Sequence, residues 1–512
     1  MPFVHSFPHM TPQEAAALIP DGAFVAFSGF TPAGAAKAVP RALADRAKEL
    51  HQAGTPFKIR VITGASTGRD LDDALADAEA ISWRAPYQSS KVLRDQINTQ
   101  RTQFVDMHLS HVQQTLAFGF FGKLDYAVIE ATELTPDGRV FLTTSIGGSP
   151  TFLQCAEKVI IEINKYHSPR LREMHDIITL APPPHRNAVP ITEPLEKLGW
   201  PYVGVDPRKI VAVVRNEEAD DVAGFDPPNR VSQAIADRVV EFLLKEMRAG
   251  RIPKEFLPFQ SGVGNVANAV LAVLGEHPDI PPFTMYTEVF QDSCVELMET
   301  GRLVGASSTA LTITPEKLQR IYEDMDFFIP RIVLRPQEIT NSPGIIRRLG
   351  LITMNTALEV DIYGHANSTH VLGTQMMNGI GGSGDFTRNA YLSIYMSPST
   401  QKKGRISSIV PMVTHVDHNE HSVQIVVTEQ GLADLRGLGA MERALSIIEN
   451  CAHPVYRPYL RRYLETAPLG HERHDLMRCF EMHRNLIDQG RMLPDLDLRN
   501  FVELEEKVGT TV

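Results

Sequence analysis

A repeated order of strand, glycine-rich loop and helix is the feature that most constrains the fold of this chain. The first example joins a short apolar strand at Ala23–Phe27 to the loop SGFTPAG at 28–34. The residues from 39 to 50 then place apolar side chains at helical spacing. The same order returns at FLPFQ (256–260), the glycine turn SGVGN and a helix for which Asn265 is the expected N-cap.

Further short apolar runs predict more strands, and helical stretches separate them. Nearly continuous apolar runs are typical of strands buried on both faces of a mainly parallel sheet. The predicted strands are 57–64, 126–131, 158–164, 209–214, 283–290, 331–334, 406–412 and 424–428. The sequence therefore predicts an α/β protein with two tandem open α/β domains and mainly parallel sheets. An acidic, proline-containing segment at 216–230 is the expected linker, which gives domains 1–220 and 231–512.

Composition limits the partners that the chain can have. With 43% hydrophobic and 22% charged residues the chain is typical of globular proteins, and its net charge of -11 disfavours nucleic acid and anionic membranes. No run approaches the roughly 18 apolar residues of a membrane span, and the N-terminus lacks the features of a targeting signal. The four cysteines are far apart, so we expect neither a disulfide framework nor a zinc site. A cytoplasmic location is expected.

Three glycine-rich loops indicate a ligand that carries negative charge. They are SGFTPAG (28–34), SGVGNVA (261–267) and NGIGGSGDF (378–386), each beside an apolar strand. Glycine lets backbone amides approach an anion closely, although each loop could also be only a tight turn. The second loop fits GxGxxA, which leaves a nicotinamide-dependent dehydrogenase as an alternative.

Two glutamates lie at apolar strands and are candidate functional residues. Glu288 lies within FTMYTEVF (283–290), and Glu429 follows the strand at 424–428. A carboxylate rarely occupies such a position without a partner or a task, although a solvated strand end remains open. The HxxHxxH pattern of His415, His418 and His421 does not have helical zinc-site spacing, so no metal is expected. A serine hydrolase is disfavoured because GxSxG is absent.

At these residues the sequence closely resembles the acetyl-CoA hydrolase/transferase family, a branch of the class I CoA-transferases. The motifs that carry the resemblance cover nearly the whole chain: VAFSGFTPAG, TGAST, QSGVGNVANAV, YTEVFQD, NSPGIIRRLG, DIYGHANST, MNGIGGSGDF and VTEQGLADLRGL. The blocks APYQSS, NKYHSPR, APPPHRN and RNAYLSI are most similar to propionyl-CoA:succinate CoA-transferases, with succinyl-CoA:acetate CoA-transferases as near relatives. The sequence Glu288-Val289-Phe290 departs from the Glu-Asn-Gly of the wider class, and Thr287 stands where Ser is common.

The resemblance implies a role for each candidate residue. Glu288 would be the nucleophile, with oxyanion stabilisation from the amides of Val263 and Gly382 and support from Asn341, Arg215 and Glu429. The implied coenzyme A contacts are Gly262, Val263, Gly264, Asn265, Val266, Leu358, Asn378, Gly382 and Lys402. Ser66, Ser89 and Arg84 would contact the substrate carboxylate.

The implied reaction exchanges CoA between propionyl-CoA or acetyl-CoA and succinate through an acyl-glutamyl anhydride and a glutamyl-CoA thioester. A carboxylate with the ordinary pKa of about 4.3 would be ionised at neutral pH, so no general base is expected. No cofactor beyond substrate CoA is expected, and the partners would be acyl-CoA and small carboxylates within a homodimer. Acetyl-CoA hydrolysis by the same glutamate is the alternative, and a non-catalytic CoA-binding protein also remains open.

Overall fold

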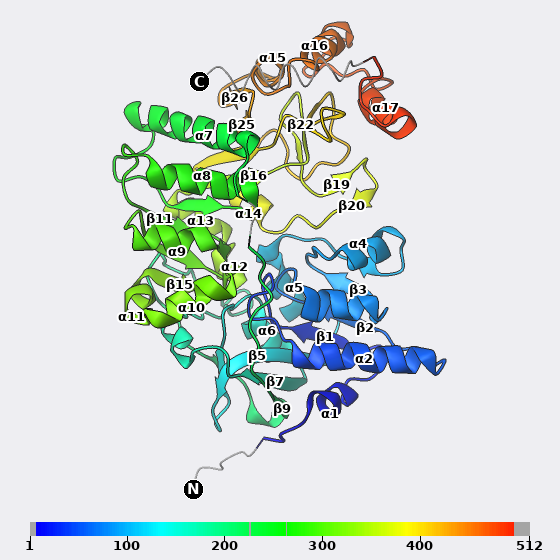
Figure 1. The fold of residues 1–512 in the computed structure, drawn as a ribbon, viewed down its shortest axis with the longest axis vertical. Coiled ribbons are helices and arrows are strands. Elements are labelled where there is room, and N and C mark those ends of the chain that lie inside the picture. Colours follow the sequence, from blue (N-terminus) through cyan, green and yellow to red (C-terminus); the bar gives the residue numbers. More distant parts are fainter. Residues whose placement is uncertain (1–6, 225–226, 263, 496–512) are drawn as a thin grey trace. The chain divides into compact units, whose positions relative to one another are not determined.

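The computed structural model describes residues 7–224, 227–262 and 264–495 (Figure 1). Its contacts group the chain into two compact units. The first consists of Met1–Gly224, Pro282–Leu349 and Met376–Asp385, and the second of Phe225–Pro281, Gly350–Gln375 and Phe386–Val512. This grouping is not the division into 1–220 and 231–512, and the limits of those two domains stay a prediction.

A nine-stranded sheet forms the first part of the first unit. Its path is β4-β3-β2-β1-β5-β6-β8, with β7 beside β5 and β9 beside β7. Only the pairings of β6 with β5 and β8 are antiparallel, so the predicted mainly parallel sheet is confirmed. The strands are β1 (Phe24–Phe27), β2 (Ile59–Ile62), β3 (Ile81–Ala85), β4 (Gln103–Phe104), β5 (Tyr126–Leu134), β6 (Arg139–Leu142), β7 (Lys158–Asn164), β8 (Val203–Gly204) and β9 (Ile210–Asn216).

Helices of this part cover the sheet with apolar faces. They are α1 (Pro12–Ala17), α2 (Ala38–Gln52), α3 (Ala74–Asp77), α4 (Lys91–Asn98), α5 (Val112–Ala117) and α6 (Ser149–Cys155). Val39, Leu43 and Ala47 of α2 are fully buried in a core with strand residues, as their spacing predicts. The N-terminus of α2 is closed by a protein carboxylate: Glu162 accepts hydrogen bonds from the amides of Lys37, Ala38 and Val39 at 2.7–3.1 Å.

The rest of the first unit contains the strands that lead to Glu288. Strands β11 (Phe283–Tyr286), β13 (Leu303–Ser308) and β15 (Ile332–Leu334) are parallel, and β12 (Val289–Phe290) pairs with β14 (Ala310–Leu311). The predicted strand 283–290 is therefore interrupted at Thr287 and Glu288. Around these strands lie α9 (Asp292–Glu299), α10 (Pro315–Glu323), α11 (Met325–Phe328), α12 (Gln337–Thr340) and α13 (Pro343–Leu349).

The second unit has its own run of strands in the order β10-β16-β21-β25-β26. They are β10 (Phe259–Ser261), β16 (Ile352–Thr356), β21 (Leu392–Met396), β25 (Ile425–Thr428) and β26 (Gly431–Asp434), and only the last pair is antiparallel. The helices are α7 (Arg230–Arg248), α8 (Asn265–Glu276), α15 (Ala440–Asn450), α16 (Arg457–Thr466) and α17 (Glu481–Gln489), while α14 (Ser383–Asn389) has residues in both units. Asn265 is the first residue of α8, so Gly264 and not Asn265 is at the N-cap position.

Several short strands complete the second unit. These are β17 (Glu359–Asp361), β18 (Ala366–Asn367), β19 (His370–Val371), β20 (Gln375–Met376), β22 (Thr400–Gln401), β23 (Ile406–Ser407) and β24 (Ile409–Val410). The predicted strand 406–412 is thus two short ones. Among the described residues, no helix combines the length and apolar composition that crossing a membrane requires.

Candidate active site

The break between β11 and β12 fixes the backbone of Glu288. Its carbonyl accepts hydrogen bonds from the hydroxyl of Ser308 (2.8 Å) and the amide of Thr309 (3.0 Å). The preceding amide of Thr287 donates to the carbonyl of Ser307 at 2.9 Å. The main chain is therefore held by the β13–β14 segment, and the carboxylate is not needed to hold the strand in place.

The carboxyl group of Glu288 is in an unusual electrostatic environment. Its Oε1 atom is buried and has no hydrogen-bond partner among the described residues. Burial and, to a smaller extent, the charge of Asp385 together raise the pKa of Glu288 to about 8, while the Asn341 side chain acts in the opposite direction. The expectation of an ordinary pKa is therefore wrong, because an unsolvated carboxylate is costly.

Gly382 lies directly against this carboxyl group. A methyl group at its α-carbon would overlap Oε1 of Glu288 and Oδ1 of Asn341. Asn341 is fully buried at the end of α12, and its side-chain nitrogen donates to the carbonyl of Gln337 at 3.1 Å. The structure thus brings together three of the predicted residues, and only glycine fits at position 382.

The segment 106–110 holds the glycine loop at 378–386 in place. Asp106 accepts from the amide of Ile380 at 2.8 Å, and the amide of Leu109 donates to the carbonyl of Gly381 at 3.3 Å. The amide and the hydroxyl of Ser110 donate to Asp385 at 3.0 and 2.6 Å. None of these anchors was predicted from the sequence. The aspartate in the motif GSGDF was the sequence signal that was available for Asp385. This residue is buried, and burial raises its pKa to about 7.

Most of the predicted coenzyme A residues belong to the second unit. The amide of Gly262 donates to the carbonyl of Met354 at 3.0 Å, and Gly264 has φ +123°, a value that favours glycine. Val263 lies outside the described residues. Val266 is in the first turn of α8, Leu358 is 38% exposed, and Lys402 is exposed in the turn between β22 and β23. Asn378 belongs to the first unit, where its side chain accepts from the amide of Gly379 at 2.8 Å.

A scan against family models matches the acetyl-CoA hydrolase/transferase N-terminal domain to residues 5–215 and the C-terminal domain to residues 318–464. Propanoyl-CoA:succinate CoA transferase of Escherichia coli strain K12 is 59% identical over 94% of this chain and 98% of its own length. The chain belongs to the acetyl-CoA hydrolase/transferase family. The resemblance in the motifs is thereby confirmed, and so is the expectation of an enzyme.

Other members of the family carry two kinds of name. Succinyl-CoA:acetate CoA-transferase of Clostridium kluyveri is 47% identical, over 94% of this chain and 90% of its own. Acetyl-CoA hydrolase of Schizosaccharomyces pombe is 42% identical, over 94% of this chain and 96% of its own.

Among solved structures, RipA from Yersinia pestis has a TM-score of 0.69 at 24% identity, covering 89% of this chain and 96% of its own. A 4-hydroxybutyrate CoA-transferase from Porphyromonas gingivalis has a TM-score of 0.60 at 20% identity (90% and 97% covered), and these two matches support the fold.

The remaining residues that the family resemblance implied have varied positions. Arg215 is exposed near the end of β9, Ser66 is buried, and Ser89 is exposed. In the second unit, Glu429 accepts hydrogen bonds from the amide of Ser399 at 2.8 Å, from the Ser399 hydroxyl and from the side chain of Gln430 at 3.0 Å. Their roles stay predictions.

Arg84 requires a correction. Its side chain is fully buried, and its guanidinium group pairs with Asp72 at 2.9 and 3.1 Å. Further hydrogen bonds go to the carbonyls of Ala65 (3.0 Å) and Ala85. Arg84 therefore neutralises a buried protein carboxylate and is shielded from any substrate carboxylate.

No metal is expected at His415, His418 and His421, and the exposure of their side chains differs. His418 is buried, whereas the side chain of His421 is 80% exposed and lies near Glu420. A different set, Glu130, His167 and Asp220, does bring metal-type ligands together. The ammonium group of Lys37 already lies 2.6 Å from Glu130 and 2.9 Å from Asp220, so a protein cation occupies this position.

The first glycine loop leads into this ion network. The amide of Gly34 donates to Asp220 at 3.1 Å, and Lys37 follows three residues later. A methyl group at Gly34 would overlap the hydroxyl of Ser145, and φ is +61°. The loop therefore needs glycine for close packing. The Gly34 amide donates to the carboxylate of Asp220, whereas the sequence predicted a ligand anion at this loop.

Proposed function

We propose that the protein is a CoA-transferase that exchanges coenzyme A between a short acyl-CoA, either propionyl-CoA or acetyl-CoA, and succinate. The observation that carries the proposal is the placement of Glu288 beside Gly382 and Asn341. Relatives that are 59% and 47% identical are named as transferases that use propanoyl-CoA or succinyl-CoA.

In the proposed mechanism, a carboxylate oxygen of Glu288 attacks the carbonyl carbon of the acyl-CoA thioester. The carbon–sulfur bond breaks, CoA leaves as a thiolate, and an acyl-glutamyl anhydride remains. The thiolate then attacks the glutamyl carbonyl, which releases the first acid and gives glutamyl-CoA. The second acid reverses both steps. Each step exchanges one activated acyl bond for another, so no ATP is consumed.

Burial of Glu288 suits this chemistry in two ways. A desolvated carboxylate loses less solvation when it becomes a neutral anhydride or thioester, and water is kept from the intermediates. A backbone amide at the oxyanion contributes about 10²–10³ in rate, and the amides of Val263 and Gly382 are the proposed donors. The pKa of about 8 adds a requirement that the sequence did not predict: Glu288 must lose a proton before it attacks.

The finer features of the proposal rest on the family resemblance. We include Arg215 and Glu429 as supporting residues and Ser66 and Ser89 as contacts of the substrate carboxylate. The coenzyme A contacts remain Gly262, Val263, Gly264, Asn265, Val266, Leu358, Asn378, Gly382 and Lys402. We further propose a cytoplasmic homodimer that needs no cofactor beyond substrate CoA and binds neither nucleic acid nor membranes.

The test is to trap the intermediate. Incubation with propionyl-CoA and no acceptor, followed by borohydride reduction, should modify Glu288 alone in peptide mass spectra, and the Glu288→Ala variant should show no adduct. An adduct at another residue, or none, would refute the covalent mechanism. An accompanying matrix of acyl-CoAs and acids should show CoA exchange that requires a second acid.

Acetyl-CoA hydrolysis is the second candidate, since relatives that are 42% identical are named acetyl-CoA hydrolases. The two reactions differ in whether water or an acid attacks glutamyl-CoA. Sustained release of free thiol without an acceptor acid, at a rate equal to that of exchange, would favour the hydrolase.

A further inference from the structure

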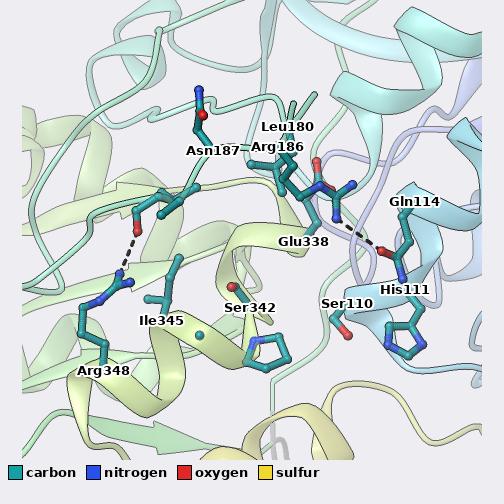
Figure 2. A pocket seen from close by; sticks show the side chains of 14 residues that line it. Ser110, His111, Gln114, Leu180, Arg186, Asn187, Glu338, Ser342, Ile345 and Arg348 are labelled. Carbon is teal, nitrogen blue, oxygen red and sulfur yellow. Dashed lines mark hydrogen bonds between the residues drawn. The ribbon is translucent and has the colours of Figure 1, made fainter. Parts of the chain in front are cut away.

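A polar cavity lies within the first unit, and neither the predicted active site nor the family resemblance assigns it a role. Its volume is about 390 Å³, roughly that of a dozen water molecules at about 30 Å³ each. This size is at the lower end of the range for small-molecule sites. The cavity is lined by residues from four segments: 110–114, 180–189, the helix α12 and the helix α13 (Figure 2).

Two arginines contribute positive charge from different walls of the cavity. Arg348 of α13 donates through Nη1 to the carbonyls of Val189 (2.8 Å) and Ile191 (3.2 Å). Arg186 donates to the carbonyl of Ala181 (3.2 Å) and to the side chain of Gln114 (3.3 Å). Figure 2 shows the two guanidinium groups on opposite sides of the cavity.

Neither arginine forms an ion pair with a carboxylate of the described residues. Their hydrogen bonds to neutral groups fix the orientation of each guanidinium group and leave Nη2 of both able to donate to a ligand. Guanidinium groups held in this way are well suited to carboxylates, which they can bind through two parallel hydrogen bonds.

Glu338 of α12 lines the cavity and limits which anions fit. Its carboxyl group makes no hydrogen bond to any described residue. Burial raises its pKa to about 7, while the charge of Arg186 acts in the opposite direction. When protonated, this group can donate a hydrogen bond to a ligand carboxylate, and when ionised it repels any anion in the cavity.

We propose that this cavity binds a small polycarboxylate anion, with one carboxylate on Arg186, another on Arg348 and a hydrogen bond to Glu338. The hydroxyls of Ser110 and Ser342 and the side chain of Asn187 offer further polar contacts along the same walls. A monocarboxylate can satisfy only one of the two guanidinium groups and binds more weakly. The inference does not depend on the transferase activity, because the ligand is held by residues other than Glu288.

Binding is measured by titration calorimetry on the full-length protein without acyl-CoA, using malate, succinate, citrate, propionate and inorganic phosphate as probes. At least one polycarboxylate should saturate at millimolar concentration or below. The variants Arg186→Gln and Arg348→Gln should each weaken it by about 10-fold or more, as expected for the loss of one charge-assisted pair. Arg208→Gln, which changes an exposed arginine paired with Asp206, should leave the affinity unchanged.

Site-specific footprinting separates this cavity from the Glu288 site and remains informative if a variant fails to fold. Phenylglyoxal modifies arginines, and peptide mass spectrometry of the unmutated protein should show that the bound acid slows modification of Arg186 and Arg348 but not of Arg208. The inference would be overturned if both cavity variants bound the acid as tightly as the unmutated protein, if phosphate bound more tightly than any polycarboxylate, or if the footprint did not change.

Discussion

The raised pKa of Glu288 predicts that replacing this residue by glutamine stabilises the protein at alkaline pH. In the unfolded chain the carboxyl group ionises near its ordinary value of 4.5, whereas in the folded protein it keeps its proton until about pH 8. Between these values the folded state binds the additional proton. The parent protein therefore loses stability as pH rises through this window, at up to about 1.4 kcal/mol per pH unit.

The size of the effect follows from the two pKa values. Their difference corresponds to at most about 5 kcal/mol. Although Oε1 is buried, the residue as a whole is only half-buried, so we expect about 2–4 kcal/mol. Glutamine has nearly the same shape and cannot ionise. Glu288→Gln should therefore match the parent near pH 5 and exceed its stability increasingly up to about pH 8, with a constant difference above that.

Calorimetric or urea unfolding of both proteins across this pH range measures the difference. Glu316→Gln, on the exposed side of α10, is the matched control and should follow the parent at every pH. A difference between Glu288→Gln and the parent that does not change with pH would refute the argument, as would a parent protein that is the more stable of the two above pH 8.

Three further predictions concern the same unit. Formation of glutamyl-CoA in rapid-mixing experiments should slow about tenfold per pH unit below about pH 8, because only ionised Glu288 attacks. Asp385→Asn should move the midpoint of this pH profile to lower pH, because it removes a negative charge near Glu288. An unmoved midpoint would contradict the assignment of the profile to Glu288. Gly382→Ala should reduce kcat/KM by at least about 100-fold, because the added methyl group overlaps Oε1 of Glu288 and Oδ1 of Asn341 and must displace both. Substantial retained activity in a folded variant would show that the close approach is dispensable. Lys37→Met should lower the free energy of unfolding by about 3–5 kcal/mol, since Glu130 would lose the ammonium group with which it pairs. A loss of less than about 1 kcal/mol in urea unfolding would argue against a stabilising role of this ion network.

Local pattern was sufficient to predict most of the parallel strands. The run KVIIEIN is β7 without any change of limits. Such runs are informative because a strand buried on both faces must be apolar throughout. Strand β21 (Leu392–Met396) was missed, since nothing in its short sequence separates it from a buried helical segment.

The sequence by itself determined the α/β class, the family and the identity of the candidate nucleophile, because these depend on residue types in local order. Only the tertiary structure decided the protonation of Glu288, since it depends on burial and on the charge of Asp385, which lies almost one hundred residues further along the chain. The pairing of Arg84 with Asp72 was likewise decided by folding, which converted an expected substrate contact into a buried ion pair. The charge state, the burial and the partners of a side chain depend on residues that folding brings around it, and no local sequence pattern specifies them.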